Sequence, residues 1–254
     1  MTFFKRILKE EEPAAGETVR EERRSGQRYT INQKFPLKAV LSFIGRDENG
    51  NFLSSKREGW DWKGRLIDFS ELGARMELAP AASATRGDSC DLKLSIDGFE
   101  LVVPCHVINI RQQSDGITYG LKHDITAEAT RNAYRQLIGI VALGATLKPK
   151  FKKTKPDESG YLVEQYASDQ PSRLSVWRHE SDKKVAAFEF MLKDCLVRAA
   201  EGHHTEYLIG SDPAAAHKAT GAKSTEIHRL FNWVVPNLAP AVPADVRAFL
   251  QAHA

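Results

Sequence analysis

Apolar and polar residues alternate in a series of short runs between residues 35 and 122. A period of two residues is typical of β-strands that bury one face. Turn residues separate the runs, and Asp97-Gly98 is a pair that favours a two-residue hairpin turn. The runs cover residues 35–43, 64–70, 73–78, 90–96, 99–110 and 117–122. Five or six short strands with regular turns predict a β-barrel or a β-sandwich.

The apolar period lengthens after the last of these strands. Ala129, Ala133, Leu137 and Ile140 recur at helical spacing, and Gly144 is expected to end the helix. We therefore expect one helix directly behind the β-rich segment.

A polar stretch, residues 147–160, then interrupts the pattern. It holds five lysines between residues 148 and 155, two prolines and one glycine. This composition is typical of a linker between domains. At the other end of the chain, residues 1–22 mix charges of both signs and predict a flexible leader. The expected organisation is a 1–22 leader, a 23–146 β-rich domain, the 147–160 linker and a 161–254 domain.

The pattern in residues 161–254 is more mixed. Residues 173–178 alternate like a strand, whereas residues 185–192 fit both a strand and a helix. The β-like flanks favour the strand for 185–192. Asp212-Pro213 predicts the start of a short helix, because aspartate caps a helix and proline suits its first turn.

Two further helices are expected near the C-terminus. One carries an apolar stripe over residues 227–235 and ends at Pro236, and the other begins at Pro243. The fold class that the pattern predicts is therefore mainly β plus α+β: a barrel or sandwich of five or six strands with a helix behind it, followed by a smaller α+β domain ending in helices.

Charge, cysteine content and hydropathy exclude several classes of protein. Lysine and arginine number 36 against 33 aspartates and glutamates, a net charge of +3, which excludes a histone-like coat of positive charge. The three cysteines form no C-x-x-C pair, so we expect no disulfide framework, no structural zinc and a cytoplasmic location. No run reaches 18 apolar residues, so no transmembrane segment is expected.

Two short motifs occur in order along the barrel segment. Arg24 and Arg28 form R-x-x-x-R just before the first strand, and Asp68, Ser70 and Gly73 form D-x-S-x-x-G at the end of another. With these motifs and the strands that follow, the sequence resembles the PilZ domain family over roughly residues 20–145. Members of that family are small β-barrels that bind cyclic di-GMP. The resemblance therefore implies that the first domain is a six-stranded antiparallel β-barrel with a C-terminal helix. The C-terminal half resembles no family that we recognise.

The resemblance implies a role for each motif residue. Arginine forks fit the O6 and N7 acceptors of guanine and can stack on its face. Arg24, Arg28 and the preceding Arg23 would therefore hold phosphate and base, with Arg23 available for a second ligand copy. Asp68 would accept hydrogen bonds from guanine N–H groups, and Ser70 would offer a hydroxyl. Gly73 would allow a tight turn, with a positive φ as one possibility.

The resulting hypothesis is a bacterial second-messenger receptor whose arginine arm becomes ordered on cyclic di-GMP and signals through domain or partner rearrangement. The alternative is a PilZ-like interaction module that binds no nucleotide, with its motifs relict or blocked by the long insert between them, around residues 46–60. We expect a downstream protein partner, no nucleic-acid partner, no enzyme activity or catalytic residue, no metal and no cofactor beyond the ligand.

Overall fold

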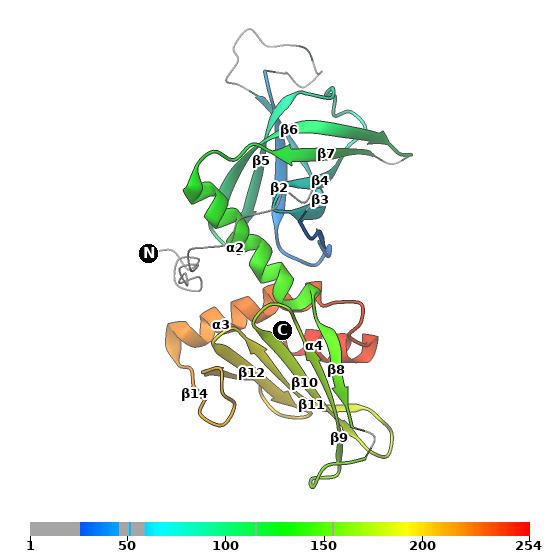
Figure 1. Ribbon diagram of the computed structural model, residues 1–254, viewed down its shortest axis with the longest axis vertical. Coiled ribbons are helices and arrows are strands. Elements are labelled where there is room, and N and C mark those ends of the chain that lie inside the picture. The colour runs from blue at the N-terminus through cyan, green and yellow to red at the C-terminus, as the bar shows by residue number, and fades with distance from the viewer. Residues whose placement is uncertain (1–25, 46–50, 52–58, 115, 154) are drawn as a thin grey trace, which may run out of the picture. The chain divides into compact units, whose positions relative to one another are not determined.

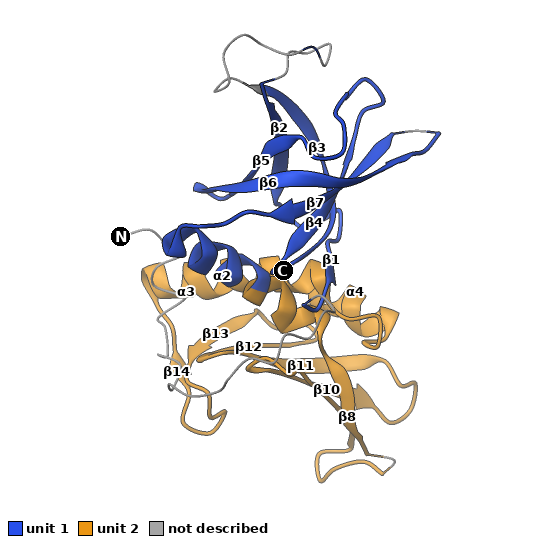
Figure 2. Ribbon diagram, turned by 45° about the horizontal axis from the view of Figure 1, so that its top comes forward, with its two compact units in different colours: residues 1–138 blue, residues 139–254 orange. Residues whose placement is uncertain are grey.

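The computed structural model describes residues 26–45, 51, 59–114, 116–153 and 155–254. It divides into two compact units, residues 1–138 and 139–254, which are described separately below (Figure 2). The predicted leader, together with Arg23 and Arg24, lies outside the described residues.

The first unit is a closed antiparallel barrel (Figure 1). Its strands are β1 (Tyr29–Thr30), β2 (Lys38–Ile44), β3 (Gly59–Ser70), β4 (Gly73–Leu78), β5 (Ser89–Ile96), β6 (Phe99–Gln112) and β7 (Ile117–His123). The order β3-β2-β5-β6-β7-β4 closes because β4 also pairs with β3, and the short β1 is added beside β3. The predicted six-stranded barrel is therefore confirmed.

Strand alternation explains why this sequence closes around a core. In β5 every second residue, from Cys90 to Ile96, is buried, as the period of two predicts. Phe43 of β2 contacts Tyr119 of β7 across the barrel, with ring centroids 5.2 Å apart. Asp97 and Gly98 both have positive φ, 45° and 78°, which confirms the predicted hairpin turn between β5 and β6.

Helix α2 (Glu128–Ala145) follows the barrel, one residue longer than the expected end at Gly144. Gly144 does not stop the helix; a Cβ there would lie 2.9 Å from the carbonyl oxygen of Val234, so glycine permits close packing. Ser172 Oγ also donates a hydrogen bond to the Leu143 carbonyl. These contacts explain why the last turns of α2 belong to the second unit.

The second unit is a seven-stranded antiparallel sheet with helices on one face (Figures 1 and 2). Its elements are β8 (Lys148–Lys152), β9 (Tyr161–Ala167), β10 (Ser172–His179), β11 (Val185–Leu192), β12 (Cys195–Ala200), β13 (Glu206–Ile209), β14 (His217–Lys218), α3 (Gly221–Val234), the 3₁₀ turn η1 (Val235–Asn237) and α4 (Ala244–Ala252). Phe188 of β11 packs against Phe231 of α3 and Phe249 of α4. The strand preferred for residues 185–192 and the two C-terminal helices are therefore correct.

Two local expectations differ from the structure. Part of the stretch expected to be a linker, residues 148–152, is strand β8, because its main chain pairs with β9 although all five side chains are exposed. The helix expected at Asp212 is only a turn, in which the amide of Ala216 donates to the Asp212 carbonyl. No helix in the described part of the chain is long and apolar enough to cross a bilayer.

Candidate ligand site at the end of strand β3

The arginine arm reaches the D-x-S-x-x-G turn through main-chain pairing. Tyr29 and Thr30 of β1 pair with Phe69 and Asp68 of β3, and the Ile31 amide donates to the Ile67 carbonyl at 2.9 Å. The side chain of Tyr29 is buried and anchors the arm. Arg28, the residue before this short ladder, is thereby held beside Asp68.

Asp68 carries two arginines on one carboxylate. Arg28 Nη1 donates to Asp68 Oδ1 at 2.8 Å, and Arg75 Nε donates to Oδ2 at 2.5 Å. The Asp68 side chain is 4% exposed, whereas those of Arg28 and Arg75 are 44% and 46% exposed. A buried anion therefore holds two half-exposed guanidinium groups at the surface, an arrangement suited to planar acceptors and phosphates.

Arg75 is the site residue that the sequence reasoning missed. It lies directly opposite Asp68 in the β3–β4 ladder. The signal was available: a tight turn that pairs Ser70 with Gly73 brings Arg75 into line with Asp68, and opposite charges attract across a strand pair.

Ser70 and Gly73 shape the turn from inside the barrel. Ser70 is 1% exposed, and its Oγ donates to the Gly73 carbonyl at 3.2 Å. Gly73 has no positive φ, so that part of the expectation is wrong. A Cβ at Gly73 would lie 2.2 Å from the Leu121 carbonyl oxygen of β7, so the close approach of this strand requires glycine.

The insert between the motifs is connected to the barrel at a point far from the Ser70–Gly73 turn. Ile44 of β2 pairs with Gly59 of β3, so the insert connects these two strands at the opposite end of β3 from Ser70. The two ends of β3 are roughly 35 Å apart at the rise of an extended strand. Most of the insert, residues 46–50 and 52–58, lies outside the described residues.

Helix α2 contacts the turn through His123 and Glu71. The Nδ1 of His123 donates to the Glu71 carbonyl at 3.2 Å, and Arg135 of α2 lies 3.5 Å from the Glu71 carboxylate. The His123 ring meets Tyr134 of α2 edge-on, with centroids 4.5 Å apart. Burial, and to a lesser extent the charge of Arg28, lowers the pKa of His123 to about 4 against the opposing Glu71 hydrogen bond.

This neutral histidine predicts acid sensitivity of the barrel. The folded-state pKa lies below the unfolded value of about 6.5, so the unfolded chain binds more protons between these values. We expect the stability that His123 contributes to be complete above pH 6.5 and lost progressively as the pH falls towards 4. The urea midpoint of the natural chain should be lower at pH 5.5 than at pH 7.0. This difference between the two pH values should be smaller for His123→Phe. An equal shift in both proteins would contradict the prediction.

A metal centre has no support in the described part of the chain, where no three His, Cys, Asp or Glu side chains gather as metal ligands. Cys90, Cys105 and Cys195 are free and buried. Burial, followed by the charges of Asp91 and Asp88, raises the pKa of Cys90 to about 12, so it is a protonated thiol at neutral pH.

Comparison with known proteins relates the first part of the chain to one family. The family model of the PilZ domain matches residues 22–139. Among solved structures, the chain is similar to the PilZ domain with c-di-GMP of YcgR from Escherichia coli, at 12% identity and a TM-score of 0.36, over 46% of this chain and 89% of that one. The comparison with curated proteins found no match. Both motifs therefore lie within the residues that the family model of the PilZ domain matches.

Proposed function

We propose that the PilZ domain is a receptor for cyclic di-GMP and binds it at the end of β3. The observation that carries the proposal is the pair of half-exposed guanidinium groups, Arg28 and Arg75, on the buried carboxylate of Asp68. Each guanidinium can meet the O6 and N7 acceptors of a guanine or a phosphate oxygen. The ligand offers both groups twice, which suits a site with more than one arginine.

Asp68 has two parts in this proposal. Without ligand it fixes Arg28 and Arg75 through both of its oxygens. With ligand, phosphate oxygens take over part of this hydrogen bonding, and the freed carboxylate oxygen accepts a guanine N–H. Ser70 and Gly73 set the shape of the turn on which Asp68 lies. Ser70 does so through the hydrogen bond of its hydroxyl to the Gly73 carbonyl, and Gly73 through its close approach to β7.

The arm supplies the signal. Arg23 and Arg24 precede Arg28 on the same segment. The described arm is held by the two-residue β1 ladder, the Ile31 hydrogen bond to Ile67 and the Arg28 ion pair with Asp68. Binding would order the preceding residues over the ligand, an order–disorder switch that presents a new surface to a protein partner or changes the relation of the domains. The protein acts in this scheme by binding, without catalysis.

Isothermal titration calorimetry of the full chain with cyclic di-GMP tests the proposal. We expect a dissociation constant in the micromolar range or below and no comparable heat with GTP. Arg28→Ala should weaken binding by about tenfold or more, since it removes charge-assisted hydrogen bonds. Arg65→Ala is the matched control, because Arg65 is an arginine of β3 that pairs with Glu77 at an exposed position.

The outcome separates two functions. Binding that is at least about tenfold weaker in Arg28→Ala and unchanged in Arg65→Ala supports the function as a cyclic di-GMP receptor. No heat from the natural chain contradicts it and favours the PilZ-like interaction module that binds no nucleotide.

A further inference from the structure

Strand β8 forms an edge of the second sheet. It pairs with β9 on one side and stands last in the strand order, so within the described residues its other side meets no strand. All five of its side chains are exposed. An open edge presents main-chain donors and acceptors that a further strand could use.

The register shows which main-chain groups face outward. The amide of Lys153 donates to the Val163 carbonyl of β9 at 2.9 Å. In an antiparallel ladder, hydrogen-bonded and non-hydrogen-bonded pairs alternate. The neighbouring pair, Lys152 and Glu164, is therefore non-hydrogen-bonded, and the N–H and C=O of Lys152 point to the open side.

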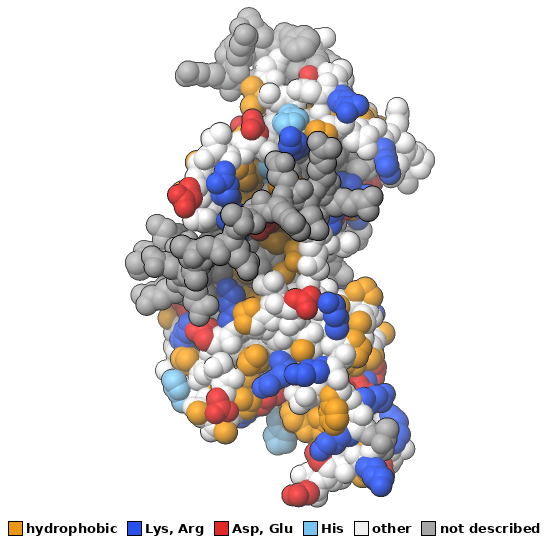
Figure 3. All heavy atoms as spheres, in the orientation of Figure 1, with side chains coloured by type: hydrophobic (Ala, Val, Ile, Leu, Met, Phe, Trp, Pro, Cys, Tyr) orange, Lys and Arg blue, Asp and Glu red, His pale blue; other side chains and the backbone are white. Residues whose placement is uncertain are grey.

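Five lysines lie on this edge strand and directly after it. Lys148 and Lys152 pair with Asp169 and Glu164, each at 2.9 Å. The other three cations, Lys150, Lys153 and Lys155, form no ion pair with any acidic residue that the structure describes. Figure 3 shows Lys and Arg side chains gathered over the β8–β9 part of this unit.

An apolar contact point lies within the same stretch of chain. Phe151 is 46% exposed and is the one large hydrophobic side chain of the second unit, among its described residues, that is strongly exposed. A ligand that fits this edge needs negative charge at intervals, an extended main chain and an apolar side chain.

We propose that the open side of β8 binds an acidic, extended segment of a partner protein by strand addition. Main-chain hydrogen bonds at Lys152 would give affinity, and carboxylates opposite the lysines would give selectivity. A second copy of β8 fits poorly, since lysines would face lysines. A flat polyanion such as a membrane or a duplex would also meet Asp169, which pairs with Lys148, and Glu158, which follows Lys155; both are exposed.

Fluorescence anisotropy with a labelled, end-blocked peptide, Glu-Val-Glu-Val-Glu-Val-Glu, tests the proposal on the full chain. Two further versions carry N-methyl groups, one on the valine amides and one on the glutamate amides. Amides of alternate residues in a strand point to opposite sides, so an added strand would direct either its valine amides or its glutamate amides towards β8. We expect one methylated peptide to bind at least about tenfold more weakly and the other to bind like the parent.

The charge requirement is tested on the protein. Lys150→Glu/Lys153→Glu should weaken the binding of the parent peptide by about tenfold, because the attraction between lysine and glutamate becomes a repulsion between two glutamates. Lys38→Glu/Lys63→Glu, an equal charge change at exposed barrel positions, should not. The proposal is overturned if both methylated peptides bind equally, or if phosphatidylserine vesicles or a DNA duplex bind and the peptide does not.

Discussion

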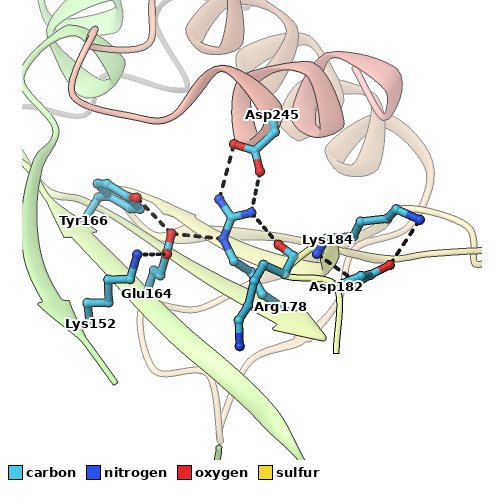
Figure 4. Close-up of polar contacts among 8 residues, drawn as sticks. Lys152, Glu164, Tyr166, Arg178, Asp182, Lys184 and Asp245 are labelled. Carbon is cyan, nitrogen blue, oxygen red and sulfur yellow. Dashed lines mark hydrogen bonds and ion pairs between the residues drawn. The ribbon is translucent and has the colours of Figure 1, made fainter. Parts of the chain in front are cut away.

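Replacing Arg178 with methionine is expected to lower the free energy of unfolding of the second unit by about 3 kcal/mol, because a buried carboxylate loses its partner. Arg178 lies at the centre of the network in Figure 4. Its Nε lies 3.2 Å from Glu164 Oε2, its Nη1 donates to the Lys183 carbonyl at 2.9 Å, and both Nη atoms donate to Asp245 of α4. One side chain thus ties β9, β10 and α4 together.

The size of the effect follows from burial. The side chains of Arg178 and Glu164 are 9% and 6% exposed. Burial alone would raise the pKa of Glu164, but the Lys152 hydrogen bond and the charge of Arg178 lower it below its ordinary value. Without Arg178 only Lys152, an exposed side chain, and the Tyr166 hydroxyl remain as partners of that carboxylate.

Hydrogen–deuterium exchange, read by mass spectrometry on peptides from β9 and β10, measures the change in the second unit. Lys184→Ala is the control, because its pair with Asp182 at 3.1 Å lies on an exposed turn and should leave exchange unaltered. The double variant Glu164→Leu/Arg178→Met should recover much of the protection, since it removes both buried charges. Unchanged exchange in Arg178→Met would show that the network contributes no stability.

Replacing Asp68 with alanine is expected to abolish cyclic di-GMP binding within the range of a calorimeter, a loss of about a hundredfold or more. Arg28 and Arg75 would lose their shared anion and repel each other, since both now donate to one carboxylate. The arm would lose its side-chain attachment and keep the short β1 ladder. A ligand would then have to order both arginines during binding.

Two variants isolate the role of the Asp68 charge. Asp68→Asn keeps the buried volume and should bind almost as poorly as Asp68→Ala. Asp61→Ala removes an exposed carboxylate of the same strand, paired with Lys93 at 2.7 Å, and should bind like the natural chain. Faster hydrogen exchange of residues 26–31 in Asp68→Asn, without ligand, would show that the arm is released. Full affinity in Asp68→Asn would contradict the assigned role.

Local patterns predicted most of the fold. The alternation in β5, the Asp97-Gly98 turn and the apolar stripe of α3 are all set by neighbours in sequence, and each is correct. Asp212-Pro213 shows the limit of such patterns. Its capping residues are those of a helix, yet the chain turns there and continues into β14, so tertiary pairing overrode the local preference.

The candidate site was predictable only in part. The two motifs identified Arg28, Asp68, Ser70 and Gly73, and the structure brings these residues to one turn. Arg24 and Arg23, which the motifs also indicate, lie outside the described residues. The reason for Gly73 was not visible, because the Leu121 carbonyl that excludes a side chain comes from a distant strand.

The sequence by itself determined the short strands and turns of the first half, and the position of the arginine and D-x-S-x-x-G motifs. The strands and turns depend on alternation and turn chemistry, which act over a few residues. The pairing of β4 with β3, which closes the barrel, was decided by the tertiary structure. Only the tertiary structure decided that Arg178 joins Glu164 to Asp245, and that five exposed residues around Phe151 form an edge strand. Ion pairs and strand pairing join residues that are far apart in the chain. Main-chain hydrogen bonds are made by groups that every residue carries, so the order of apolar and polar residues does not show which segments will pair.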